Sequence, residues 1–250
     1  MTVLVGGVGE LFQSDLDVGR RAVDQLALEQ LGDGVFVEEL HYGAVAVAHR
    51  LQELCPEWLL LIGAVSWGGR PGVVRRRVMR DLAPAAEDVQ AAVRDAAVGY
   101  VDIPLLLDVC AGFGVLPSRT VLLEVQPART DSGVELSAEV EAALPELGRL
   151  VRAELARRPL VEVVARLHER CAGDRLEPSP PLTTVRELLA ELDGYDDTDR
   201  WGAAFALRDR LRLQIAQSHT GEGMEHLDWA LWWALIEELD RLQPLDVNTT

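Results

Sequence analysis

The chain alternates between short segments that are apolar throughout and longer segments whose apolar positions recur every three or four residues. The first kind is typical of β-strands buried on both faces, and the second of helices that bury one face. Five segments predict strands: residues 2–8, 35–40, 58–65, 73–79 and 120–128. The fourth of these contains three consecutive arginines and predicts a solvated strand at the edge of a sheet.

Helical spacing fills the intervals between these strands, over residues 18–31, 44–54, 102–114 and 137–157. Pro145 is expected to kink the last of these helices. Regular alternation of strands and helices predicts an α/β fold, here a three-layer sandwich with a mainly parallel five-stranded sheet.

Beyond residue 158 the pattern is helical only. We therefore expect an α/β domain over 1–158 and a helical C-terminal extension over 159–250, with a proline-rich linker at about 176–183. One segment of the extension, 227–239, is apolar nearly all round and carries Trp229, Trp232 and Trp233. Tryptophan is enriched in protein interfaces, so this helix is expected to pack on the α/β domain, on a partner, or on a second copy in a homo-oligomer.

Charge and composition exclude several classes of function. The 250 residues carry a formal net charge of −17, which disfavours binding to nucleic acid or to an anionic membrane surface. No apolar run reaches the roughly 20 residues that a membrane span needs. The N-terminus lacks the pattern of a signal peptide, and the three cysteines are widely separated, so we expect a cytoplasmic protein with reduced thiols.

A glycine turn follows the first strand. Gly7 and Gly9, with Glu38 and Glu39 at the end of the second strand, occupy the positions typical of a dinucleotide site. However, Phe12 stands where the third glycine would be, and helical spacing starts too far downstream for a helix N-terminus to meet a phosphate. A dinucleotide-dependent enzyme therefore remains only a distant alternative.

A longer pattern resembles the hydrogenase maturation endopeptidases. It comprises "VLVGGVGELFQSDLDVGRRAV" (3–23), "EELHYGAVAVAHRL" (38–51), "WLLLIGAVSWGGRPGVV" (58–74), "DIPLLLDVC" (102–110) and "LPSRTVLLEVQP" (116–127). The resemblance implies an α/β sandwich over roughly residues 1–158 and a cytoplasmic peptidase. It also implies a substrate, the large subunit of a nickel–iron hydrogenase, whose C-terminal extension the family removes once nickel is inserted.

The same resemblance places the family's three nickel ligands at Leu16, Gly63 and Asp102. Leucine and glycine offer no side-chain donor for a metal ion. In addition, Glu10 replaces a family asparagine, and the family's glycine-rich loop has become Tyr42, Gly43 and Ala44. We therefore expect no cofactor, and a diverged homologue that binds a hydrogenase large subunit or a similar protein without nickel-dependent cleavage.

A rebuilt site is the alternative. Asp15 or Asp17, His41 and Asp102 follow strand ends that meet at one edge of a parallel sheet, and carboxylate and imidazole together suit transition metals. Such a site would give an active endopeptidase with nickel. Equally, Asp15 or Asp17 and Asp102 are expected to cap helices, with His41 as a half-buried residue at a strand end. For contact with the partner we expect Tyr42, Gly43 and Trp67, together with the three tryptophans of the extension.

Overall fold

The computed structural model describes residues 2–79 and 101–158, together with isolated positions between 161 and 213. The chain divides into two compact units, Met1–Ala153 and Glu154–Thr250. Those positions of the second unit that are described beyond residue 158 are helical. The linker expected at 176–183 and the three tryptophans at 229, 232 and 233 lie outside the described residues.

A single five-stranded sheet forms the centre of the first unit. Its strands are β1 (Val3–Gly7), β2 (Val35–Glu39), β3 (Trp58–Ala64), β4 (Val74–Met79) and β5 (Arg119–Val125). They lie in the order β2-β1-β3-β5-β4, and all neighbours are parallel except β4, which runs antiparallel to β5. The predicted mainly parallel sheet is confirmed, and β4 lies at its edge as expected.

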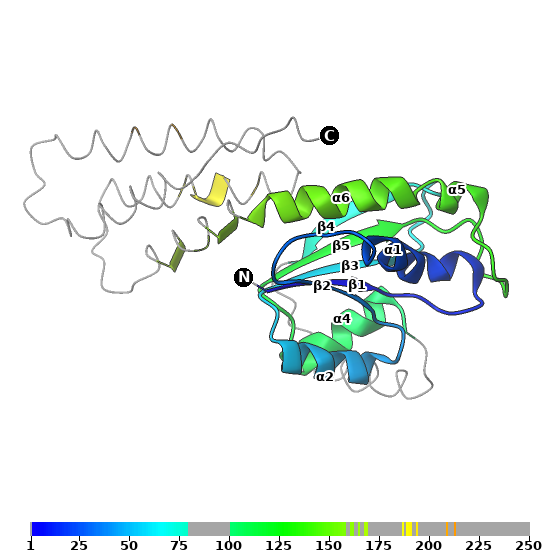
Figure 1. Ribbon diagram of the computed structural model, residues 1–250, viewed down its shortest axis with the longest axis horizontal. Coiled ribbons are helices and arrows are strands. Elements are labelled where there is room, and N and C mark those ends of the chain that lie inside the picture. Colours follow the sequence, from blue (N-terminus) through cyan, green and yellow to red (C-terminus); the bar gives the residue numbers. More distant parts are fainter. Residues whose placement is uncertain are drawn as a thin grey trace, which may run out of the picture. The chain divides into compact units, whose positions relative to one another are not determined.

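Helices cover both faces of this sheet (Figure 1). On one face lie α1 (Val18–Leu26), α5 (Ala138–Glu141) and the first part of α6 (Leu144–Ala156); α2 (Ala44–Leu54) and α4 (Ile103–Gly112) lie on the other. A short 3-10 helix, η1 (Ser14–Asp17), leads into α1. The three-layer sandwich is therefore confirmed.

The central strands β1, β3 and β5 are almost entirely buried because helices pack on both of their faces. Beneath the sheet, one apolar cluster joins strand residues such as Leu4 and Leu61 to Leu51 of α2 and Leu106 of α4. Burying these side chains supplies the main driving force for folding of the unit.

Two helices differ from their predicted lengths. Helix α1 ends at Leu26, and residues 27–30 are exposed. The helical spacing of apolar residues that continues to Leu31 therefore does not correspond to a buried helix face. The helix predicted over 137–157 is two helices, α5 and α6, separated at Ala142 and Ala143. Pro145 disfavours helical backbone at the residue before it but is tolerated in a first helical turn, so it sits near the start of α6 instead of kinking a longer helix.

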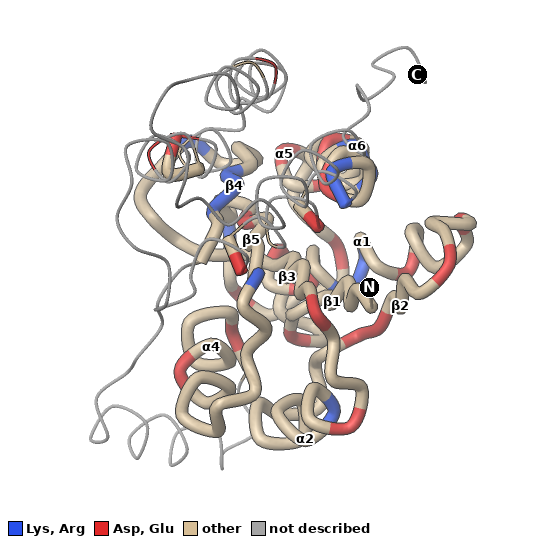
Figure 2. Tube along the Cα trace, turned by 90° about the vertical axis from the view of Figure 1, so that its left-hand side faces the viewer, with Lys and Arg blue, Asp and Glu red and all other residues tan. Residues whose placement is uncertain are grey.

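The arginines of β4 are also not simply solvated, which corrects the prediction. Arg75 and Arg77 both donate to the carboxylate of Glu124 on β5, which is fully buried, at N–O distances of 2.5 to 3.0 Å. Figure 2 shows these cations on β4 beside the acidic position of β5. The arginine run therefore attaches the edge strand to the sheet.

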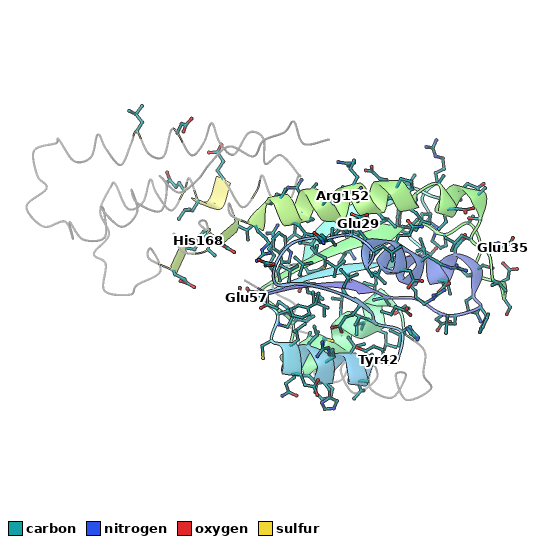
Figure 3. The ribbon with its side chains drawn as sticks, viewed as in Figure 1. Glu29, Tyr42, Glu57, Glu135, Arg152 and His168 are labelled. Atoms are coloured by element: carbon teal, nitrogen blue, oxygen red, sulfur yellow. The ribbon has the colours of Figure 1, made fainter. Side chains whose placement is uncertain are left out.

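The parallel strands end together at one edge of the sheet. Glu57, which precedes β3, lies at one end of the sheet, and Glu135, which follows β5, lies at the opposite end (Figure 3). This second end carries the loops β1–η1, β2–α2, β3–β4 and β5–α5, so it is the edge at which α/β proteins place their sites. In the described part of the chain, no helix has the length and apolar character needed to cross a membrane.

Candidate functional site

A cleft of about 230 Å³ opens at the carboxyl edge of the sheet. Three segments line it: the β1–η1 loop, the β2–α2 loop, and the segment that precedes α4. The lining residues are Gly9, Glu10, Leu11, Gln13, His41 and Val101. Its volume is below the roughly 300–1,000 Å³ of sites for drug-sized ligands, so it suits a single side chain or a short peptide segment better than a dinucleotide.

The glycines of the β1 turn allow close packing of backbone. A side chain at Gly7 would collide with the carbonyl oxygen of Gly19, 2.3 Å from the ideal Cβ position, and one at Gly19 would collide with the carbonyl oxygens of Ile62 and Val8. These glycines therefore let α1 lie directly on β1 and β3. This use of the turn, and the distance in sequence from Gly9 to the start of α1, both argue against a phosphate site.

Asp15 holds two loops together. Its side chain is fully buried, and its oxygens accept hydrogen bonds from the backbone N–H groups of Ala128, Arg129 and Ser137 at 2.6 to 2.9 Å and from the Ser137 hydroxyl at 2.9 Å. Burial by itself would raise the pKa of this carboxyl, but the hydrogen bonds outweigh it and hold the pKa below its ordinary value. All of these donors belong to the β5–α5 loop.

Asp17 pairs with arginines of its own helix. It lies at the N-cap position of α1 but makes no capping hydrogen bond; its carboxylate accepts instead from Arg20 at 2.6 Å and from Arg21 at 3.1 Å. The expectation that Asp15 or Asp17 caps this helix is therefore wrong, because both carboxylates have stronger partners elsewhere. Asp102, in contrast, does cap a helix: its Oδ1 accepts the N–H of Leu105 at 2.8 Å, at the start of α4.

His41 lies at the end of β2 with its ring partly exposed, as expected for a strand-end residue. Its Nδ1 is 3.1 Å from Oε2 of Glu39, and its ring meets Tyr42 edge-on at 6.2 Å between centroids. Of the four residues proposed for a rebuilt site, only His41 lines the cleft, while Asp15 and Asp17 are held by other partners. In the described part of the chain, no group of three or more His, Cys, Asp or Glu side chains is arranged to hold a metal ion.

Glu10 is the cleft residue that sequence reasoning did not place in a site. Burial and the nearby charge of Asp102 raise the pKa of its carboxyl above the ordinary value, against a hydrogen bond from the backbone of Val101 that lowers it. Gln13 was also not anticipated. The resemblance did single out Glu10 as a replacement for asparagine, and this was the available signal.

The positions that correspond to the family's nickel ligands do not fit a metal ion. A side chain at Gly63 would meet Cδ1 of Ile103 and the carbonyl oxygen of Val8, each 3.0 Å from the ideal Cβ. Leu16 has only its backbone to offer, and its carbonyl oxygen accepts the N–H of Glu10 at 3.2 Å. Asp102 is engaged as a helix cap. These contacts disfavour nickel binding at the three positions.

Of the residues expected to contact a partner, the three that the structure describes follow strands β2 and β3 at the same edge. Tyr42 is well exposed, and Gly43, with φ of 105°, forms the N-cap of α2. Trp67 follows β3; the Arg75 guanidinium lies 4.3 Å from its ring centroid, and its backbone N–H donates to Gln126. A second cleft of about 650 Å³ adjoins this region, between residues 70–74 and the start of α5 and α6.

The fold and site together define an α/β sandwich protein with a small cleft, lined by Glu10 and His41, at the carboxyl edge of its sheet. The sequence matches no family model and no curated protein. It is similar to the solved structure of hydrogenase 2 maturation peptidase from Thaumarchaeota archaeon SCGC_AB-539-E09, at 28% identity and a TM-score of 0.46, over 62% of this chain and 98% of that one.

Two further solved structures are similar. The hydrogenase maturating endopeptidase HybD from E. coli aligns at 20% identity and a TM-score of 0.49, over 63% of this chain and 94% of that one. The [NiFe] hydrogenase maturation protease HycI from Thermococcus kodakarensis KOD1 aligns at 18% identity and a TM-score of 0.45, over 62% and 92%. The names of these three proteins are those of the family that the sequence motifs resemble.

Proposed function

We propose that this chain is a hydrogenase maturation protease-like protein that binds a nickel–iron hydrogenase large subunit, or a similar protein, without nickel-dependent cleavage. The order and spacing of the sequence motifs support the choice of partner. The cleft at the carboxyl edge, which His41 lines, provides the place for contact, and the exposed ring of Tyr42 lies edge-on to His41.

One observation carries the loss of nickel chemistry. Cδ1 of Ile103 and the carbonyl oxygen of Val8 each lie 3.0 Å from the ideal Cβ position of Gly63, so a donor side chain there would need these neighbours to shift. With Leu16 also lacking a donor, two of three expected ligands are missing. A mechanism that depends on Lewis-acid help and on positioning of the scissile bond by a metal then loses both.

The test uses the full chain and the large-subunit precursor of a nickel–iron hydrogenase from the same organism, in nickel-loaded and nickel-free forms. We expect a stable complex by size-exclusion chromatography, and a precursor of unchanged mass by intact mass spectrometry after long incubation. A shortened precursor would refute the loss of cleavage, and absence of any complex would refute the choice of partner.

Cleavage through Glu10 and His41, a different set from the rebuilt metal site, is the second candidate, and one observation favours it: Glu10, whose carboxyl pKa is raised, shares the cleft with His41. Such a pair suits general acid–base chemistry. If the precursor is shortened, Glu10→Gln and His41→Asn should each abolish the shortening, whereas Leu28→Ser, at an exposed apolar residue after α1, should leave it intact.

We further propose that the protein is cytoplasmic and that it self-associates through the tryptophan-rich segment 227–239.

A further inference from the structure

Three apolar side chains are exposed together at the carboxyl edge of the sheet. Leu11 is 45% exposed, Phe12 64% and Val134 62%. They lie on two segments that pair side by side through a bridge between Gln13 and Gly133, although more than a hundred residues separate these segments in the sequence. We call these three residues the apolar rim. Leu11 also lines the cleft, so the rim continues into it.

The backbone of the rim is held in an unusual conformation. Phe12 and Ser14 have φ of 64° and 46°, in the left-handed region that side chains other than glycine seldom adopt. Such strain persists only when the surroundings impose it. Here the N–H of Gly133 donates to the Phe12 carbonyl at 2.9 Å, and the N–H of Ser14 donates to the Gly133 carbonyl at 3.0 Å.

Asp15 adds a second restraint, since its buried carboxylate collects the N–H groups of the β5–α5 loop. These restraints hold the backbone at Phe12, and its side chain is exposed. Full burial of a phenylalanine ring is favourable, and the fold forgoes most of that contribution at this residue. Strain together with exposure of a large apolar group at a site edge points to contact with another molecule.

Charge indicates the chemistry of that molecule. Glu10, Asp131 and Glu135 flank the rim residues along the two segments, and Asp131 and Glu135 are exposed. The nearby cations already have partners: Arg20 and Arg21 pair with Asp17, Arg21 also donates to the carbonyl of Val134 at 3.1 Å, and Arg129 donates to the carbonyl of Glu135 at 2.8 Å. With a net charge of −17 on the whole chain, a second copy would be repelled from this surface.

We propose that the apolar rim docks a positively charged segment of a protein partner, with an apolar side chain of that segment against Phe12 and Lys or Arg side chains beside Glu10, Asp131 and Glu135. This inference rests on the proposed function, since it names the chemistry of the partner surface at the same site. An apolar anchor surrounded by complementary charge is the usual composition of an interaction hot spot and its rim.

The test compares variants of the full chain. Phe12→Asn removes the ring but keeps a residue that tolerates positive φ, so the loop retains its shape. Asp131→Asn combined with Glu135→Gln removes the flanking charge, and Leu28→Ser, at a residue that follows α1, removes an exposed apolar side chain as a control. Binding is measured to the large-subunit precursor by calorimetry, and to two synthetic twelve-residue peptides by fluorescence anisotropy. The peptides share two leucines and differ in carrying four lysines or four glutamates.

We expect the lysine peptide and the precursor to bind, and Phe12→Asn to weaken both roughly tenfold, about 1.4 kcal/mol. The charge variant should weaken binding and flatten its dependence on salt concentration, and Leu28→Ser should bind like the wild type. Equal binding of the two peptides, or no effect of Phe12→Asn on the lysine peptide, would overturn the proposal. So would self-association of the chain that Phe12→Asn abolishes, because the occupant would then be a second copy.

The two proposals fail in different ways. If the lysine peptide binds through Phe12 while no precursor is captured, the rim stands and the proposed function fails. If the precursor is captured and Phe12→Asn leaves its affinity unchanged, the proposed function stands and the rim is overturned.

Discussion

The Asp15 carboxylate shows how much one buried side chain can organise. Four hydrogen bonds from a loop more than a hundred residues away converge on its two oxygens. Hydrogen bonds to a charged group each contribute more than those between neutral groups. Asp15 is thus a positioning residue for the carboxyl edge: it fixes the β5–α5 loop against the β1–η1 loop.

Asp15→Asn should lower the free energy of unfolding by about 2 kcal/mol near neutral pH, because an amide replaces one acceptor oxygen with a donor that faces N–H groups. In the wild type, the folded-state pKa of Asp15 lies below that of the unfolded chain. Its stabilisation is therefore complete above about pH 5 and is lost as the pH falls through the folded pKa. Urea unfolding between pH 7 and pH 3 should show the difference between wild type and variant shrinking on acidification.

The control for this experiment is Asp131→Asn, at an exposed residue of the same loop. It should leave stability nearly unchanged at every pH. An acid dependence that is equal in the two variants would contradict the assignment to Asp15.

Gly63 carries a second prediction at this scale. Gly63→Ala should destabilise the protein by about 1–3 kcal/mol, because the added Cβ meets Ile103 and the Val8 carbonyl at 3.0 Å. Ile103→Val removes the Cδ1 atom in that contact and should by itself cost about 0.5–1.5 kcal/mol. The double variant should be more stable than the sum of the two single effects predicts, as measured by thermal unfolding in a double-mutant cycle. Strict additivity would show that Ile103 does not restrict this position.

Among elements, the attachment of β4 to β5 depends on a buried charge. Glu124 is fully buried and has two arginine partners, Arg75 and Arg77, which are each partly exposed. An ion pair that loses one partner leaves the other charge uncompensated, which is costly in the interior. Arg75 and Arg77 both compensate the charge of Glu124, so the loss of one arginine leaves the other paired with this carboxylate.

Arg75→Gln and Arg77→Gln should each cost less than about 1.5 kcal/mol, whereas the double variant should cost about 3 kcal/mol or more, since the buried carboxylate is then unpaired. Adding Glu124→Gln to the double variant should recover part of the loss. Arg70→Gln, in the exposed turn before β4, is the matched control. Chemical unfolding compares these five variants with the wild type. Additive single effects, or no recovery with Glu124→Gln, would exclude a shared role for the arginines.

The element boundaries show why some features were predictable from sequence. Strands β1, β3 and β5 agree with their predicted ranges within three residues, since a continuous apolar run has nowhere to lie but between two layers of helices. The end of α1 was not predictable, because the apolar residues beyond Leu26 keep the helical spacing after the sheet surface that would cover them has ended. Asp102 was correctly expected to cap a helix, a local interaction between near neighbours in the chain.

At the scale of the whole molecule, the proposed loss of nickel chemistry has a direct consequence. A ligand that binds the folded state stabilises it by an amount that grows with concentration, about 2.7 kcal/mol at one hundred times Kd. Adding Ni²⁺ to the untagged full chain should therefore leave its Tm unchanged. A relative that keeps all three ligand side chains should be stabilised under the same conditions. A concentration-dependent rise in Tm for this chain, abolished by His41→Asn, would instead support a rebuilt metal site.

The sequence by itself determined that this protein is an α/β sandwich with a mainly parallel sheet, and that positions 16 and 63 carry no metal donor. Both conclusions depend only on residue type and on the period of apolar positions. The tertiary structure decided which acidic residue does what. Asp15 serves a loop 122 residues away, Glu124 holds an edge strand, and Glu10 shares a cleft with His41. These roles depend on which distant segments fold against one another. The carboxylates of Asp and Glu are chemically alike, so their roles differ only through the groups that the fold brings next to each of them.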